Sequence, residues 1–342
     1  MKKILIVTRD PLVHFRQMKD ERGITDDGQY QFVINDLDCE PDFVVIKEKG
    51  LRQPKRFHVP RSHTILLTGE PYSVLDYPKA FCSQFGTVLA CQREVKAGPQ
   101  TNVIYTQAIL TWFVGATFEP DGTNRFPMNY EAIRRAQPKK DKLISVISST
   151  KAFTQGHVDR LRFITKLQQR YGDKVDVFGR GFKPFSDKWD VLAPYKYHIV
   201  IENSSSDYYW TEKIADCYLA GTYPIYHGCT NIGNLFPEKA LTPIDIRHFN
   251  DAADTIDRVI SDNLYEKRKA ELEKSKELVL DKYNMFNFIA QTCKDIESKE
   301  AGISVPSPDI DTLINPASKY FSWHNLYLYT IGRNYYKLIS KL

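Results

Sequence analysis

No apolar segment in this sequence approaches the length that a membrane span requires. Near the N-terminus the apolar run extends only from Ile4 to Val7, after Lys2 and Lys3 and before Arg9. A transmembrane helix needs about 20 apolar residues, and a signal-peptide core needs about seven or more. The run therefore predicts a buried first strand, and we expect a cytoplasmic protein.

The patterns of metal sites and of disulfide frameworks are also absent. None of the six cysteines stands in a C-x-x-C pair, and the histidines form no cluster at zinc-ligand spacing. These absences argue against the common structural zinc sites and predict reduced thiols. The sequence has no internal repeat and no low-complexity segment, which argues against repeat architectures and disordered chains.

The charge is nearly balanced, with a net charge of +5 over 342 residues. This small excess favours anionic partners such as phosphates. The chain lacks the dense basic stripe and the RNP-like motif of nucleic-acid-binding proteins. Apolar residues make up 42% of the sequence and charged residues 26%, as in folded soluble proteins. The length suits two domains of ordinary size.

Short apolar runs alternate with amphipathic stretches along most of the chain. Several runs are continuously apolar, which is typical of strands that are buried on both faces. Helical periodicity covers residues 158–167 and 252–260, the latter after Asn250 as the expected N-cap. The alternation predicts α/β domains with largely parallel sheets. The expected strands are 4–8, 31–34, 43–46, 64–67, 88–91, 143–148, 175–178, 198–201 and 223–226.

A polar segment with one proline, residues 136–142, precedes the strand at 143–148 and marks the expected linker. Three prolines interrupt any regular element over residues 302–316. We therefore expect an N-terminal domain over residues 1–138, a C-terminal domain over 142–300, and a C-terminal tail over 301–342.

The segment from Tyr195 to Pro237 is the most informative. It reads as strand, loop, helix and strand, with Thr211 capping the helix and Gly221 ending it. Ligands of such units bind beyond the carboxyl ends of the strands, where the helix N-terminus favours a phosphate. A cation in the first turn of a helix, such as Lys213, interacts unfavourably with the helix dipole. A bound pyrophosphate would turn this cost into an attraction. A solvated Lys213 is the alternative interpretation.

Across this segment the sequence resembles the donor-site signature of the family-10 fucosyltransferases, which reads roughly Y-K-F-x-L-x-F-E-N-S, D-Y, x-T-E-K and L-A-G-x-x-P-V. The resemblance covers about residues 143–262. Trp210 and His227 depart from the signature, and so does His248, which stands in place of an acid. The matching stretches are Tyr195–Ser204, Asp207-Tyr208, Thr211-Glu212-Lys213, Ala220–Ile225, Asn234–Pro237 and Gly179-Arg180-Gly181, with Ser148, Arg160, Leu167 and Phe249.

The resemblance implies a GT-B fold, in which two Rossmann-like domains face each other across a cleft. It implies an inverting transfer of L-fucose from GDP-fucose to a glycan hydroxyl, as an α-1,3 linkage to GlcNAc or glucose in a surface polysaccharide. Glu70, in the triplet Thr68-Gly69-Glu70, would be the catalytic base, and no metal would be required. The implied donor-binding residues are Arg160, Arg180, Glu202, Asn203, Tyr209, Glu212 and Lys213.

Two alternatives remain open, a GT-B enzyme that uses another nucleotide sugar and a non-catalytic glycan-binding protein. Intact Arg180, Glu212 and Lys213 argue against the second. The chain lacks the N-terminal anchor of Golgi members, which indicates a bacterial source and lipopolysaccharide or capsule acceptors. Aromatic and basic residues interleave over 318–342. They predict either a peripheral contact with the inner face of the cytoplasmic membrane or a helix that packs on the protein itself.

Overall fold

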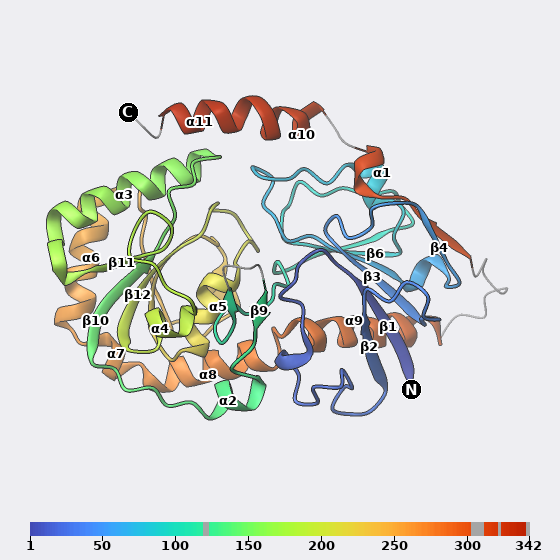
Figure 1. The fold of residues 1–342 in the computed structure, drawn as a ribbon, viewed down its shortest axis with the longest axis horizontal. Coiled ribbons are helices and arrows are strands. Elements are labelled where there is room, and N and C mark those ends of the chain that lie inside the picture. The colour runs from blue at the N-terminus through green and yellow to red at the C-terminus, as the bar shows by residue number, and fades with distance from the viewer. Residues whose placement is uncertain (119–122, 302–310, 321–322, 340–342) are drawn as a thin grey trace. The chain divides into compact units, whose positions relative to one another are not determined.

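The structure is a computed structural model that describes residues 1–118, 123–301, 311–320 and 323–339. The chain divides into two compact units. The first comprises residues 1–111 and 282–326, and the second comprises residues 112–281 and 327–342. Each unit is built around a parallel sheet, so the predicted α/β class is confirmed (Figure 1).

The sheet of the first unit has six parallel strands in the order β2-β1-β3-β5-β6-β7. The five strands expected in this part of the chain are present. β7 was not expected, because its side chains are alternately exposed and half-buried and it has no continuous apolar run. The strands are β1 (Lys2–Val7), β2 (Tyr30–Ile34), β3 (Phe43–Lys47), β5 (Thr64–Leu67), β6 (Thr87–Ala90) and β7 (Asn102–Tyr105).

Both faces of this sheet are buried. Side chains alternate between the two faces along each strand, so neighbouring residues enter different buried clusters. Ile4 and Ile6 point to a cluster with helix α9 (Met285–Glu300), whereas Leu5 and Val7 join a cluster with helix α1 (Lys79–Cys82). The shorter elements of this unit are η1 (Phe15–Gln17), β4 (Lys55–Phe57) and η2 (Arg61–His63).

The compact units do not coincide with the predicted domain ranges. Helix α9 groups with the first unit, because Met285, Phe286 and Ile289 are fully buried against the sheet of that unit. Residues 112–138 group with the second unit. This segment contains β8 (Thr117–Phe118), β9 (Asn124–Arg125) and α2 (Tyr130–Arg135). Hydrogen bonds to residues of the second unit hold it, as described below.

The sheet of the second unit has five parallel strands in the order β11-β10-β12-β13-β14. The four strands expected here are present, and the two-residue strand β14 was too short to predict. Helix α5 packs on β12 and β13, and α3 packs against α6 (Figure 1). The strands are β10 (Lys142–Ile147), β11 (Asp176–Phe178), β12 (Tyr195–Ile201), β13 (Tyr223–His227) and β14 (Thr242–Pro243).

The helices of the second unit include both predicted amphipathic helices. α6 begins at Phe249 with His248 at the N-cap position, so the expected cap at Asn250 is wrong. The helix starts earlier because Ala252 N–H already bonds to the carbonyl of His248. The helices are α3 (Gln155–Tyr171), η3 (Gly172–Lys174), α4 (Lys188–Leu192), α5 (Glu212–Leu219), η4 (Ile232–Asn234), α6 (Phe249–Ser261), α7 (Leu264–Lys267) and α8 (Lys269–Leu280).

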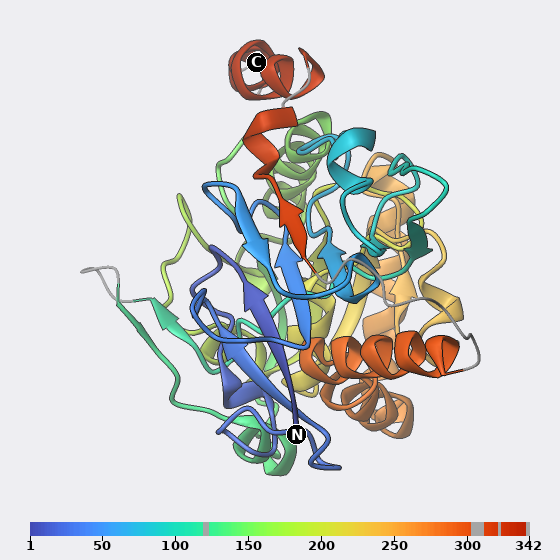
Figure 2. The same ribbon diagram turned by 90° about the vertical axis from the view of Figure 1, so that its right-hand side faces the viewer.

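The C-terminal segment begins with strand β15 (Thr312–Ile314), which pairs antiparallel with β4 (Figure 2). It continues through η5 (Ala317–Tyr320), α10 (Trp323–Tyr327), the π-helical turn η6 (Leu328–Gly332) and α11 (Arg333–Ile339). None of the helices in the described ranges is long and apolar enough to cross a bilayer.

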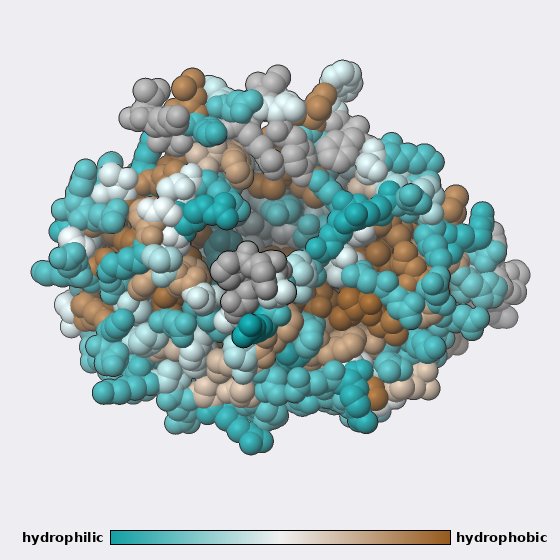
Figure 3. Space-filling view, in the orientation of Figure 1, coloured by the Kyte–Doolittle hydropathy of each residue, from teal (hydrophilic) through white to brown (hydrophobic). Residues whose placement is uncertain are grey.

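Large apolar side chains are exposed on this segment, with Trp323 at 87% and Leu338 at 65% exposure. Apolar and hydrophilic side chains lie side by side along these helices (Figure 3). α11 packs against α3, while Asn325 Oδ1 accepts a bond from Asp76 N–H at 3.0 Å. The segment therefore both contacts the folded units and presents apolar surface to solvent.

Candidate active site

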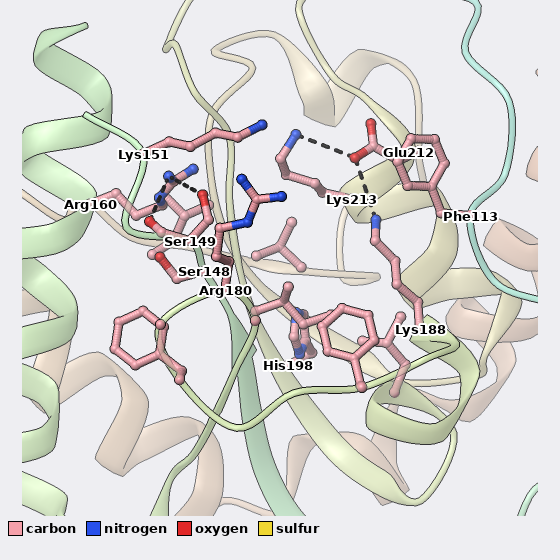
Figure 4. A pocket seen from close by; sticks show the side chains of 18 of the residues that line it. Phe113, Ser148, Ser149, Lys151, Arg160, Arg180, Lys188, His198, Glu212 and Lys213 are labelled. Atoms are coloured by element: carbon pink, nitrogen blue, oxygen red, sulfur yellow. Dashed lines mark hydrogen bonds and ion pairs between the residues drawn. The ribbon is translucent and has the colours of Figure 1, made fainter. Parts of the chain in front are cut away.

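A cavity of about 650 Å³ lies in the second unit, over the carboxyl ends of β10 and β12. The loop after β11, helix α4 and the first turn of α5 complete its walls (Figure 4). This is the edge of a parallel sheet at which ligands of such folds bind. The polar residues in its lining are Ser148, Ser149, Lys151, Arg160, Arg180, Lys188, His198, Glu212 and Lys213.

The first turn of α5 is fixed by a fully buried carboxylate, Glu202, at the end of β12. Glu202 Oε1 accepts a bond from Thr211 N–H at 2.9 Å, and Glu202 Oε2 accepts one from the Thr211 hydroxyl at 2.7 Å. Thr211 caps the helix, as predicted from the sequence, by accepting a bond from Lys213 N–H. Burial raises the pKa of Glu202, and the Lys213 ammonium at 3.2 Å opposes that rise.

Lysines and carboxylates alternate from Glu202 into the cavity wall. Lys213 Nζ lies 3.5 Å from Glu212 Oε1, and Lys188 Nζ lies 3.4 Å from the same oxygen. Lys188 also binds Asp216 Oδ2 at 2.9 Å. Burial opposes the ionisation of Glu212, but Lys213 and Lys188 outweigh it and lower its pKa to about 2. Glu212 is therefore an anion that orients two cations.

The same network holds the segment that enters the second unit. Asp216 Oδ1 accepts bonds from the N–H groups of Phe113 at 2.9 Å and Val114 at 3.2 Å. Asp187 Oδ1 accepts one from Gly115 N–H at 2.9 Å. The Phe113 ring lines the cavity, with Lys188 Nζ 4.6 Å from its centre. Two buried acids thus hold the segment that carries Phe113, whose aromatic ring forms part of the cavity wall.

Arg160 is held on the opposite side of the cavity. Its guanidinium donates to Asn203 Oδ1 at 2.8 Å and to the carbonyl of Ser149 at 3.3 Å. Burial lowers the pKa of Arg160 to about 10, so the group stays charged at neutral pH. Its Nε atom and the buried Ser148 hydroxyl have no hydrogen-bond partner among the described residues. These two groups would find partners on a polar ligand.

Arg180 and Lys151 are the exposed cations of the cavity lining. Neither side chain makes an ion pair or a hydrogen bond with another described residue. Arg180 follows Gly179, which has a φ of +118°. A Cβ atom there would lie 1.8 Å from the carbonyl oxygen of Ser148. Glycine is therefore needed for the loop to approach β10 and carry Arg180 over the cavity.

The charges of the lining favour an anion. Four cationic side chains and one carboxylate, Glu212, face this space (Figure 4). The remaining wall is apolar and suits the flat ring of a base or sugar. It contains Phe113, Ile147, Phe182, Pro184, Phe185, Leu192, Val200 and Ile201. Lys188, itself neutralised by Asp216 and Glu212, adds a fifth cation beside this wall.

The structure brings four of the seven predicted donor-binding residues to the cavity, namely Arg160, Arg180, Glu212 and Lys213. Glu202, Asn203 and Tyr209 are not part of its lining. Glu202 and Asn203 instead hold Lys213 and Arg160 in place, and Tyr209 is buried with 2% exposure.

The three departures from the donor signature, Trp210, His227 and His248, lie outside the lining. The Trp210 ring packs edge-on against Phe236 at 5.2 Å, and His227 Nδ1 lies 3.1 Å from the carbonyl of Ile244. Sequence reasoning did not select Phe113, Lys151, Lys188 or His198. No local motif marks them, and only their position at the cavity reveals them.

The predicted base, Glu70, lies in the first unit, in the loop after β5. The loop is held by its backbone, because Gln92 Nε2 donates to the carbonyl of Glu70 at 2.8 Å. The Tyr77 hydroxyl accepts bonds from Gly69 N–H at 3.2 Å and Glu70 N–H at 3.5 Å. Glu70 thus stands on a fixed loop at the carboxyl edge of its sheet.

Two further acids lie at this edge. A Cβ atom on Gly69 would lie 2.3 Å from Glu48 Oε1, so the Glu48 carboxylate touches the backbone beside Glu70. Buried Lys47 binds Asp10 Oδ2 at 3.1 Å and Glu48 Oε1 at 3.4 Å. Asp10 and Glu48 follow β1 and β3 but were not selected from the sequence, because single acids at strand ends carry no motif.

Comparisons with known proteins assign one segment of the chain to a family. Residues 137–302 match the model of the C-terminal region of glycosyltransferase family 10 (fucosyltransferase). Residues 137–302 form a family-10 glycosyltransferase domain. The match confirms the resemblance derived from the donor signature. Among the described residues of this domain and the rest of the chain, no group of three or more His, Cys, Asp or Glu side chains is placed to hold a metal.

One curated relative is the α-(1,3)-fucosyltransferase FucT of Helicobacter pylori, which is 35% identical over 71 residues. That match spans 20% of this chain and 15% of the relative. A solved α1,3-fucosyltransferase with GDP has a TM-score of 0.51 and 15% identity, covering 90% of this chain and 92% of that one. This likeness shows the fold and confirms the predicted GT-B architecture of two Rossmann-like domains.

A solved α1,3-fucosyltransferase with GDP-fucose has a TM-score of 0.47 and 15% identity. It covers 82% of this chain and 90% of that one.

Proposed function

We propose that the protein is an inverting fucosyltransferase that transfers L-fucose from GDP-fucose to a hydroxyl group of a glycan. The family-10 domain and the name of the Helicobacter relative support the choice of sugar. The observation that carries the proposal is the cationic cavity, where Arg180 has no intramolecular partner among the described residues. An unpaired guanidinium beside Lys213 suits a diphosphate.

In the proposed reaction, the bond between fucose C1 and the diphosphate breaks while the acceptor oxygen attacks C1 from the opposite face. Negative charge then grows on the leaving GDP, where Arg180, Lys213 and the first turn of α5 would stabilise it. Glu70 would take the proton of the acceptor hydroxyl. The single displacement would convert a β-linked donor into an α-linked fucoside.

The finer assignments also belong to this proposal. The acceptor would be GlcNAc or glucose of a surface polysaccharide such as lipopolysaccharide, joined through an α-1,3 linkage. The protein would act in the cytoplasm, with α10 and α11 touching the inner face of the membrane. The exposed Trp323 and Leu338 side chains support that contact.

A transfer assay with a panel of nucleotide sugars tests the proposal. GDP-fucose, GDP-mannose, UDP-galactose and UDP-GlcNAc would each be incubated with the protein and with LacNAc, and nucleotide release and the glycosylated product would be measured. We expect transfer from GDP-fucose alone. Transfer from another donor would keep the enzyme class and replace the sugar. Glycan binding without transfer from any donor would favour the non-catalytic alternative.

A further inference from the structure

His198 is a buried polar side chain of the cavity wall that the proposed reaction does not use. It lies on β12 with 4% exposure and lines the cavity. In Figure 4 it lies below Arg180, on the side away from the amino groups of Lys151 and Lys213. The apolar side chains of Leu192 and Val200 line the same cavity. A polar atom in an apolar wall suits the edge of a nucleobase rather than a diphosphate.

Hydrogen bonds on the far side of the ring fix which nitrogen carries the proton. The Ser145 hydroxyl donates to the carbonyl of Val191 at 3.0 Å, and its oxygen lies 2.7 Å from His198 Nδ1. A carbonyl only accepts, so the single hydroxyl proton is used there. Nδ1–H must therefore donate to the Ser145 oxygen. The other nitrogen, Nε2, is left with a lone pair.

The ring also stays neutral. Burial and the charge of Lys188 lower the pKa of His198 to about 3. Nε2 has no hydrogen-bond partner among the described residues. Nε2 is consequently a fixed acceptor, and leaving a buried acceptor unpaired on ligand binding is costly.

We infer that His198 Nε2 reads the base of the donor nucleotide by accepting a hydrogen bond from the exocyclic amino group of guanine. The inference rests on the proposed function, which supplies the guanine nucleotide. Hypoxanthine lacks this amino group but keeps the ring N–H and the carbonyl, and adenine carries C–H at the same place. His198 is then a specificity-determining residue that favours guanine over either base.

The test compares the affinities of GDP and IDP, measured by calorimetry, for the parent protein and for His198→Phe. We expect the parent protein to bind GDP about ten-fold more tightly than IDP, as for one hydrogen bond to a buried acceptor. Phenylalanine keeps a flat ring but accepts no such bond, so the GDP-to-IDP ratio should fall to about one. The matched control is His227→Phe on the neighbouring strand, because His227 does not line the cavity. This control should keep the ten-fold ratio.

The outcomes separate the two proposals. Equal affinities for GDP and IDP in the parent protein overturn the inference, even if His198→Phe fails to fold. A ten-fold ratio that persists in folded His198→Phe also overturns it. Failure of the parent protein to bind either nucleotide overturns the proposed function, and the inference falls with it.

Discussion

At the carboxyl ends of both parallel sheets, one lysine lies between two carboxylates. The two sheet edges differ in the other charged side chains around that lysine. In the first unit Lys47 is held between Asp10 and Glu48, with Glu70 beside them. In the second unit Lys213 is held between Glu202 and Glu212. Each lysine is thus neutralised by two carboxylates.

The charged residues around each of these lysines are different. The second unit adds Lys151, Arg160 and Arg180, so cations exceed acids at its strand ends. At the strand ends of the first unit Glu70 follows β5, while Arg9, which follows β1, donates to the carbonyl groups of Gly50 and Leu51. A cationic site suits a diphosphate, whereas a carboxylate such as Glu70 suits the uptake of a proton. The fold alone does not assign these two roles, and the side chains at the strand ends do.

The largest expected effect concerns the carboxylate of Glu70 in the first unit. Glu70→Gln keeps the shape of the side chain and removes its basicity, so transfer should fall by roughly two to four orders of magnitude. The affinity for GDP should barely change, because GDP takes no part in the proton transfer. Steady-state transfer rates and GDP titrations measure both quantities.

Glu48→Gln is the matched control for Glu70→Gln, since Glu48 is already paired with Lys47. We expect the Glu48 variant to lose less transfer than the Glu70 variant. The reverse order would move the role of base to Glu48.

Breaking the charge network of the second unit should reduce stability strongly. Lys188→Met leaves Asp216 buried without its cation, and such a loss costs about 3–5 kcal/mol of unfolding free energy. Denaturant unfolding measures the change. Adding Asp216→Asn to the variant should restore part of the loss, because the amide oxygen still accepts bonds from Phe113 and Val114 without a charge. No recovery in the double variant would argue that the lysine acts by packing alone.

A smaller effect concerns pH. Burial raises the pKa of Asp187 from 3.8 to about 6, so ionisation of the carboxyl costs folding free energy. The cost is absent below pH 4, grows as the pH rises towards 6, and is complete above it. Asp187→Asn keeps the accepted bonds from Gly115 and Trp189. It should stabilise the protein at pH 7.5 by about 3 kcal/mol and not at pH 4. Thermal melts at both pH values decide, and equal gains at the two would contradict the account.

The smallest effect concerns the exposed tail helices. Trp323→Ser with Leu338→Ser removes two exposed apolar groups. Binding to vesicles that contain anionic lipid should weaken several-fold, and unfolding free energy should change by less than about 0.5 kcal/mol, as for surface sites. A large loss of stability with unchanged vesicle binding would favour packing of the tail on the protein over membrane contact.

The elements that could be predicted are those whose information is local. Buried strands such as β1 and β12 appear as apolar runs, and Thr211 and Gly221 mark both ends of α5. The assignment of α9 to the first unit could not be predicted, because an amphipathic pattern shows an apolar face but not which sheet covers it. Residues 112–138 group with the second unit because Phe113 bonds to Asp216, 103 residues away in the sequence, and Gly115 bonds to Asp187, 72 residues away. Local sequence patterns do not show such distant pairs.

The residues of the candidate site also divide into those that a local sequence motif reveals and those that it does not. Arg180, Glu212 and Lys213 lie in contiguous motifs, so the sequence reveals them together. Lys188 and His198 gain their roles from partners on other elements, Asp216 and Ser145, and from the walls of the cavity. The sequence does not show such pairings, because the fold creates them.

The central claim is that the second unit binds the diphosphate of a guanine nucleotide. A calorimetric titration with GDP tests it most directly, on the parent protein and on the variants Arg180→Ala and Arg180→Lys. The loss of charge-assisted hydrogen bonds predicts roughly 10- to 100-fold weaker binding by Arg180→Ala. Arg180→Lys should recover only part of it, because an ammonium does not reproduce the planar guanidinium fork. Unchanged GDP affinity in Arg180→Ala, with the fold intact, would contradict the account.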